Sequence, residues 1–196
     1  MTPRESRRAA LCRTIVWLSL LLSAAPLLAQ PSGWTTFRSP DGGFQVQYPE
    51  SWQVVVARPA DGRGGLEQNV LMSGELYKVT FIQQDQSTWP GSFQITLLAN
   101  PRKADLEQVL AGFDLSDLWE DDPGDAVLAG LSAKTWIRWG YDHLQREIIA
   151  VAPRGVLHVS YEVSNPNDPD MADHKRIYDR MAQSFAEFPG NADARQ

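Results

Sequence analysis

The side chains best suited to chemistry are a run of oxygen donors in the last quarter of the chain. The run consists of Asn165, Asn167, Asp168, Asp170 and Asp173. Calcium prefers carboxylate and amide oxygens, so Asp168, Asp170 and Asp173 are candidate ligands, although the run lacks the central glycine and closing glutamate of an EF-hand loop. The same side chains would also place negative charge at the start of a following helix. We expect this structural role, and we predict no metal and no cofactor.

Hydrolytic chemistry has no supporting motif. The histidines, His143, His158 and His174, have neither the i, i+4 spacing nor the HExxH pattern of a metal site. The sequence has no GxSxG, and the lysine of the SAK segment at 132–134 follows its serine too closely for an SxxK nucleophile. We therefore expect a protein that is not an enzyme. A small hydrolase remains an alternative, which a close histidine–serine or carboxylate pair in a cleft would favour.

A tryptophan in a loop is the candidate contact for a partner. Trp89 stands beside a Pro-Gly pair, and an exposed indole in such a loop suits a protein surface or a sugar. Trp136 and Trp139 lie three residues apart on an expected strand, so their rings should face opposite sides of a sheet. Core packing accounts for most of the other tryptophans.

The N-terminus has the three parts of a secretory signal peptide. Four arginines in the first 13 residues precede an apolar run at 15–28, and the small residue Ala29 follows. The run is shorter than the about 20 apolar residues of a membrane span, and Pro26 interrupts it. We expect residues 1–30 to be removed, which leaves an exported protein, periplasmic or secreted, with no stable membrane anchor. Arg7 and Arg8 partly resemble a twin-arginine signal, so the general and twin-arginine export routes both remain open.

The cysteine content limits the chemistry of the chain, and its net charge limits the classes of molecule that it can bind. Cys12, the only cysteine, precedes the apolar run, whereas a lipoprotein cysteine would follow it, so the processed chain has no thiol. The first 30 residues hold four arginines and one glutamate, so the 18 basic and 24 acidic residues of the whole chain become 14 and 23 after cleavage. This negative balance opposes binding to nucleic acid or anionic lipid.

The remaining chain has the length and pattern of one domain, 31–188, with a polar tail at 189–196. Apolar and polar residues alternate along several segments, as expected for half-buried strands. Strands are predicted at 34–37, 44–48, 52–57, 76–83, 92–99, 132–139, 144–151 and 156–163. The acidic segment 120–125 is predicted to be a solvated turn.

Two helices are predicted from caps and helical spacing. Asn100-Pro101 is the expected start of the first helix, whose apolar stripe extends to Phe113. Asp168-Pro169 is the expected cap and first proline of the second helix, which is predicted to run from about Asp170 to Phe185. Its buried stripe should end at Phe185, while Asp179 and Arg180 lie off that stripe. Two blocks of strands, each followed by a helix, favour an α+β fold with an antiparallel sheet covered by helices.

Three segments support a more specific fold. They are FRSPDGGFQVQYPESW at 37–52, LAGLSAK at 128–134, and YDRMAQSF at 178–185. Together they resemble the PsbP-like family, which includes the extrinsic photosystem II subunit and many exported bacterial proteins. The resemblance implies an αβα sandwich, with the antiparallel sheet flanked by helices, and a role as an assembly or binding partner. No functional residue is transferred by motif, because fold alone does not determine function.

The expected function is an exported, non-catalytic accessory or binding module that engages another envelope or secreted protein. An alternative is a carrier that holds a small apolar ligand between sheet and helix. An enlarged cavity between those two layers would favour the carrier, whereas a tightly packed core with an exposed patch would favour the partner module.

Overall fold

The computed structural model describes residues 33–58, 74–83, 91–119, 123–140 and 142–187. The chain divides into two units, 1–32 and 33–196, and the fold below is that of the second unit alone. The predicted signal peptide, the polar tail and Trp89 fall outside the described residues. Among the helices described, none is long and apolar enough to cross a membrane.

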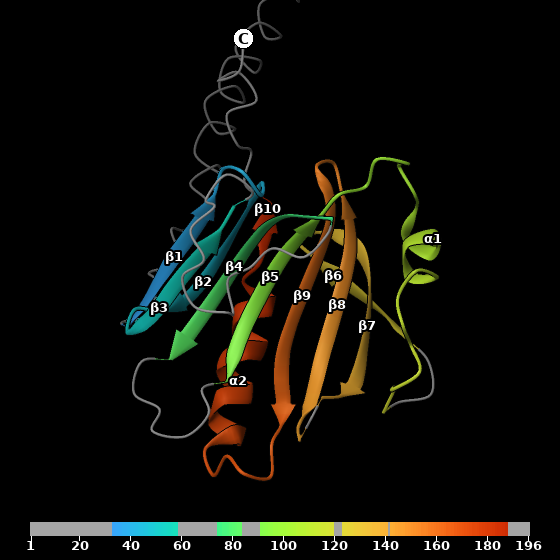
Figure 1. The fold of residues 1–196 in the computed structure, drawn as a ribbon. Helices are drawn as coiled ribbons and strands as arrows, with labels where there is room; N and C mark the ends of the chain where they lie inside the picture. The colour runs from blue at the N-terminus through green and yellow to red at the C-terminus, as the bar shows by residue number, and fades with distance from the viewer. Residues whose placement is uncertain (1–32, 59–73, 84–90, 120–122, 141, 188–196) are drawn as a thin grey trace, which may run out of the picture. The chain divides into compact units, whose positions relative to one another are not determined.

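The described part of the domain is dominated by antiparallel strands. These are β1 (Trp34–Ser39), β2 (Phe44–Pro49), β3 (Trp52–Ala57), β4 (Glu75–Gln83), β5 (Ser92–Leu98), β6 (Gly124–Leu128), β7 (Leu131–Trp139), β8 (Leu144–Ala152), β9 (Gly155–Ser164) and β10 (Ala186–Glu187). The larger sheet has the order β3-β4-β5-β9-β8-β7-β6, and the smaller one has the order β1-β2-β10. Two helices accompany them, α1 (Leu106–Leu110) and α2 (Met171–Gln183) (Figure 1).

The main core lies between the seven-stranded sheet on one side and α2 with the small sheet on the other. We call this face of the larger sheet the inner face. Tyr178 of α2 packs against Phe93 of β5, with ring centroids 6.3 Å apart. Phe44 of β2 packs against Tyr77 of β4, with centroids 6.3 Å apart. These contacts belong to one hydrophobic cluster that α2, the small sheet and the inner face share.

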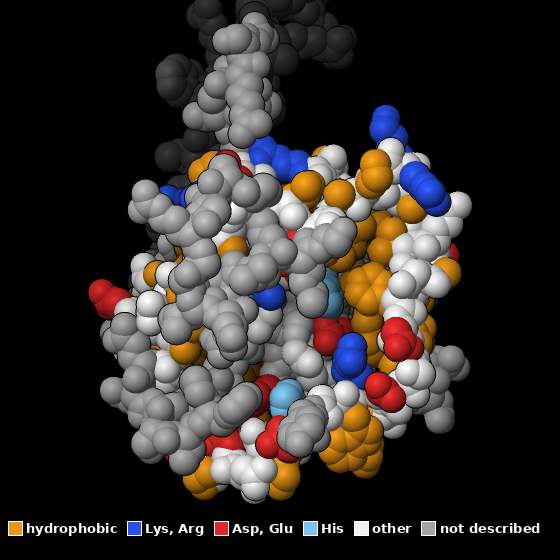
Figure 2. All heavy atoms as spheres, in the orientation of Figure 1, with side chains coloured by type: hydrophobic (Ala, Val, Ile, Leu, Met, Phe, Trp, Pro, Cys, Tyr) orange, Lys and Arg blue, Asp and Glu red, His pale blue; other side chains and the backbone are white. Residues whose placement is uncertain are grey.

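The outer face of the same sheet carries a smaller apolar cluster under α1. Trp136, Ile149 and Val156 are buried there, and α1 and the segment after it pack against them. Figure 2 shows hydrophobic side chains gathered on this α1 side of the molecule. Because α1 has only five residues, it covers little of the sheet. The α+β assignment is confirmed, but the αβα sandwich is realised only in part, since one of its two helical layers is a single short turn.

The predicted start of the first helix is wrong. The helix begins after Asp105, whose carboxylate accepts a hydrogen bond from the Gln108 backbone N–H at 2.9 Å. The Gln108 side chain accepts in return from the Asp105 N–H at 3.0 Å, which completes a capping box. The Asn100 side-chain amide instead donates to the Ala104 carbonyl and accepts from the Ala104 N–H, at 2.9 Å each. Lys103 between them has a φ of 51°, which an α-helix cannot contain.

The second helix begins one residue after its predicted start near Asp170, but its N-cap residue is not the predicted Asp168. The helix begins at Met171 with Asp170 as its N-cap residue. Asp168 does not cap it, because one oxygen of its carboxylate accepts a hydrogen bond from the Asp170 N–H at 2.9 Å. The local turn formed by that aspartate competes with helix initiation, which is the usual behaviour of this residue type before a proline.

β6 was missed, because part of it lay in the segment predicted to be a solvated acidic turn. It pairs with β7, and Leu128 stands opposite Leu131 across a two-residue connection. Ala129 and Gly130 have φ values of 55° and 80°, as a tight hairpin of this kind requires. β6 is an edge strand with mostly exposed side chains, so it lacks the apolar alternation that marks a half-buried strand.

The prediction for the paired tryptophans of β7 is confirmed. Trp136 is 3 % exposed in the outer-face cluster, whereas Trp139 is 46 % exposed. Trp139 packs edge-on against Trp119, with ring centroids 4.8 Å apart. The backbone around Trp119 runs along this end of β7 and donates from the Trp119 N–H to the Ile137 carbonyl at 2.8 Å. This contact brings two exposed indoles together.

Candidate ligand pocket between α2 and the sheet

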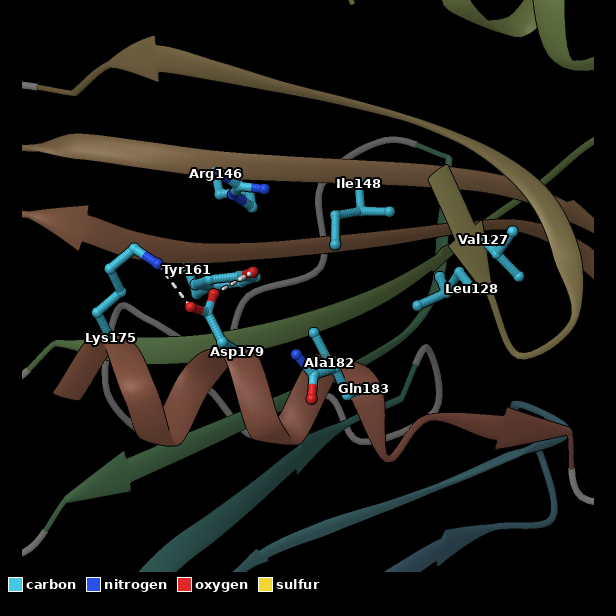
Figure 3. A pocket seen from close by; sticks show the side chains of 9 residues that line it. All are labelled: Val127, Leu128, Arg146, Ile148, Tyr161, Lys175, Asp179, Ala182 and Gln183. Carbon is cyan, nitrogen blue, oxygen red and sulfur yellow. Dashed lines mark hydrogen bonds and ion pairs between the residues drawn. The ribbon is translucent and has the colours of Figure 1, made fainter. Parts of the chain in front are cut away.

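A pocket of about 310 Å³ opens where the inner face of the larger sheet extends past α2. α2 buries Met171, His174, Tyr178 and Met181 in the core. The adjacent helical stripe at 175, 179 and 182–183 faces the β6–β8 part of the sheet instead (Figure 3). The pocket is lined by Val127, Leu128, Arg146, Ile148, Tyr161, Lys175, Asp179, Ala182 and Gln183.

One end of the pocket is polar. The Asp179 carboxylate accepts a hydrogen bond from the Tyr161 hydroxyl at 3.1 Å and another from the Lys175 ammonium at 2.5 Å. Arg146 stands beside Tyr161, because β8 and β9 place these two residues opposite each other. Figure 3 shows these four side chains at the same end of the pocket, with Lys175 and Asp179 projecting from the helix, whereas the polar Gln183 lies farther along it beside Ala182.

Arg146 is the unusual member of this group. Its Nε atom is buried and has no hydrogen-bond partner among the residues that the structure describes. Asp179 is the acid that lines the pocket, and its two oxygens accept from Tyr161 and Lys175 and not from this Nε. A buried donor without a partner is destabilising by about 1–3 kcal/mol, so Arg146 is held in this wall at a cost to stability.

The opposite end of the pocket is aliphatic. Leu128 is buried at the end of β6, and Ile148 lies between the two ends on β8. Val127 stands at the rim with 74 % of its surface exposed. Ala182 supplies the helix side of the wall without filling the space. The pocket therefore separates charge from apolar surface along its length.

Tyr161 acts in this pocket as a hydrogen-bond donor. Burial raises the pKa of its hydroxyl far above the ordinary value of 10.0, and the neighbouring Asp179 carboxylate raises that pKa further. The hydroxyl therefore keeps its proton at physiological pH and holds Asp179 in place. The pocket thus offers fixed charges, a neutral donor and an aliphatic wall, which suit binding.

The candidate calcium ligands are not brought together. The second oxygen of Asp168 lies 2.8 Å from His174 Nδ1, while the first accepts from the Asp170 N–H. Asp173 forms an ion pair with Arg176 on the surface of α2. Within the described residues, no group of three or more acids, histidines or cysteines is arranged to hold a metal ion. The absence of a metal requirement stays a prediction.

The outer face holds an acid–histidine pair that bears on the hydrolase alternative. Glu147 is buried, and its Oε2 lies 2.5 Å from Nε2 of His158. Beside this pair the Gln145 amide donates to the hydroxyl of Ser160. Neither hydrogen bond joins a histidine to a serine hydroxyl, so the arrangement lacks the nucleophile–base contact of a serine hydrolase.

Glu162 is a second buried acid, on β9 close to the loop that precedes α2. Burial raises the pKa of its carboxyl above the ordinary value of 4.5. The charge on His143 and a hydrogen bond with Asn165 lower that pKa in part, and Asp168 raises it again. The net effect is that the folded protein holds this proton more tightly than the unfolded chain does.

We expect Glu162→Gln to make the free energy of unfolding less dependent on pH. A carboxyl whose pKa is raised by folding binds more protons in the folded state, so wild-type stability falls as pH rises from 4.5 through the raised pKa. The amide cannot ionise, so the free energy of unfolding of the variant should rise relative to that of the wild type between about pH 4.5 and about pH 7.5. Urea unfolding at both pH values measures this, and Glu50→Gln, which changes an exposed acid, is the control. A parallel pH dependence in wild type and Glu162→Gln would contradict the prediction.

The sequence pattern did not reveal the pocket residues. Arg146 occupies an inner-face position of β8, in line with Ile148 and Ala150, where apolar residues are expected. The sequence signal that could have indicated the pocket is this arginine among the otherwise apolar inner positions of the strand. Asp179 was predicted to lie off the helix stripe; it does leave the core-facing stripe, but it lines the pocket instead of facing bulk solvent.

Comparison with known proteins supports the fold and leaves the family open. No family model and no curated protein sequence matches the chain. Cyanobacterial PsbP from Synechocystis sp. PCC 6803 superposes with a TM-score of 0.52 at 11 % identity, covering 82 % of this chain and 95 % of that one. LpqN of Mycobacterium tuberculosis, described as involved in cell envelope biogenesis, gives a TM-score of 0.47 at 16 % identity, with 80 % and 91 % covered. The first likeness confirms a PsbP-like fold, and membership of that family stays a prediction.

Proposed function

We propose that this protein is an exported, non-catalytic binding module that carries a small, mainly apolar ligand between α2 and the sheet. The observation that supports the carrier over the partner module is the pocket of about 310 Å³ between those two layers. Export is part of the proposal because of the N-terminal charge and apolar pattern.

The size and lining of the pocket limit what it can carry. Small-molecule sites commonly enclose about 300–1,000 Å³, so this pocket belongs to the smallest of them. Each buried methylene contributes about 0.8 kcal/mol, so an aliphatic ligand that buried six of them would gain about 5 kcal/mol. That gain must also offset the loss of translational freedom, so an aliphatic tail alone gives weak binding and the polar end has to contribute.

Ligand binding should be detectable as a rise in the thermal unfolding midpoint of the processed protein. Octanol is a suitable neutral aliphatic probe. At ten times its dissociation constant it should stabilise the folded state by about 1.4 kcal/mol, which corresponds to about 3–6 °C for a domain of this length.

Two leucine variants test where the probe binds. Ala182→Leu fills the pocket from the helix side and should abolish the shift. Ala172→Leu adds the same side chain at an exposed position of the same helix and should leave the shift intact. The carrier proposal is wrong if octanol does not shift the wild-type midpoint, or if both variants retain the shift.

Engagement of an envelope or secreted protein is the second candidate function. It is favoured by the exposed pair formed by Trp119 and Trp139, because aromatic side chains are enriched in protein interfaces. A Trp119→Ala/Trp139→Ala variant that lost a co-purifying envelope protein, while keeping octanol binding, would support this second role.

A further inference from the structure

We propose that the ligand of this pocket is a medium-chain aliphatic carboxylate whose head group binds Arg146. This inference rests on the proposed function, because it names the chemical class of the ligand for the same pocket. It is carried by three observations: the unmet donor of Arg146, the net charge of the lining, and the separation of polar and aliphatic walls.

The first observation is the geometry of Arg146. Among the described residues, nothing accepts a hydrogen bond from its buried Nε. An arginine side chain is always charged and presents its donors as a planar fork that matches the two oxygens of a carboxylate. Asp179 accepts from Tyr161 and from Lys175, and among the described residues it makes no hydrogen bond with the Nε of Arg146. Because the Nε itself is buried, a ligand carboxylate would bind the part of the Arg146 side chain that lines the pocket, while Asp179 kept its contacts with Tyr161 and Lys175.

The second observation is the charge of the lining. Arg146 and Lys175 are formally positive and Asp179 is formally negative, so the pocket carries one net positive charge. It does so in a protein whose acidic residues outnumber its basic ones. One carboxylate balances that charge, whereas an alcohol leaves it unbalanced and a phosphate monoester brings about 1.5 to 2 negative charges.

The third observation is the arrangement of the walls. Figure 3 shows Arg146, Tyr161, Lys175 and Asp179 at one end, with Val127 and Leu128 at the other. A ligand with its carboxylate at the first end would lay its chain past Ile148 toward the edge strand β6. The chain would then cover Val127, which is largely exposed in the empty pocket. The walls therefore favour an amphiphile in one orientation.

The test compares three eight-carbon probes, octanoate, octanol and octyl phosphate, by calorimetric titration of the processed protein. Octanoate should bind at least about tenfold more tightly than octanol, because a charge-assisted bidentate contact is made only by the carboxylate. Octyl phosphate should bind more weakly than octanoate. Arg146→Met should lower the ratio of octanoate affinity to octanol affinity by about tenfold or more, because only the carboxylate loses its charged partner.

Arg176→Met is the matched control, since it removes the same charge from an exposed position of α2. It should leave the affinity for every probe unchanged. Equal losses in Arg146→Met and Arg176→Met would mean general charge attraction and would overturn the inference. If Arg146→Met does not fold, the octanoate–octanol comparison on the wild type is decisive by itself.

The remaining outcomes separate this inference from the proposed function. Equal affinities for octanoate and octanol would overturn the carboxylate while leaving the carrier in place. Tighter binding of octyl phosphate would overturn it in favour of a phosphate-headed ligand. Failure of all three probes to bind would overturn the carrier and the inference together.

Discussion

Phe185→Ala is expected to lower the free energy of unfolding by about 3–5 kcal/mol, the usual loss for a buried phenylalanine. The ring is buried, as the sequence predicted, and stacks on Phe44 with centroids 4.9 Å apart. This contact joins the end of α2 to the small sheet. A domain of this size is stable by about 5–15 kcal/mol, so the variant should lose a large share of its stability. Urea unfolding followed by circular dichroism measures the loss.

Arg176→Ala is the control for that experiment. Arg176 is exposed on α2, so its removal should change stability by about 0.5 kcal/mol or less. The sequence suggested Asp179 and Arg180 as the neutral positions, and the structure makes both unsuitable. The guanidinium of Arg180 lies 3.9 Å from the centre of the Trp34 ring, and Asp179 lines the pocket. If Phe185→Ala were as mild as Arg176→Ala, the end of α2 would not be packed on this domain.

Gly155→Ala is expected to destabilise the domain by about 2–5 kcal/mol, combining overpacking with backbone strain. Gly155 begins β9 with a φ of 153°, a conformation that other residues rarely adopt. A Cβ built there would lie 2.2 Å from the backbone carbonyl oxygen of Leu98, which cannot rotate away as a side chain could. The clash would push β9 from β5 at the centre of the larger sheet. Thermal and urea unfolding measure the effect.

Gly130→Ala tests whether the close contact matters beyond the loss of a glycine. Gly130 also has a positive φ, 80°, but a Cβ there would meet nothing within 4 Å. We expect a loss of about 1–2 kcal/mol from backbone strain alone. A loss at Gly130 equal to or greater than the loss at Gly155 would show that the approach to Leu98 is relieved at little cost.

Most of the strands could be predicted because their signal is local. In β8 and β9 the side chains alternate between the two faces of a sheet, and the predicted segments 144–151 and 156–163 match the observed strands to within one residue at each end. The body of α2 was equally clear from its apolar stripe. The errors fall at helix starts, where a local turn formed in place of the first helical turn. Examples are the Asp168 turn before α2 and the positive φ of Lys103 before α1.

The sequence by itself determined the α+β class of this protein, contains no recognisable catalytic motif, and predicts export from its N-terminal pattern. Only the tertiary structure decided that there is a pocket and which residues line it. Its walls come from β6, β8, β9 and α2, and they meet because α2 packs on β9 while the strand order places β8 and β6 on the far side of β9. The alternation that identifies a strand is a property of neighbouring residues. Whether an inner-face residue such as Arg146 contacts a helix, the core or a cavity depends on how much of the sheet α2 and the small sheet cover. That coverage is set by contacts between segments that are distant in the chain.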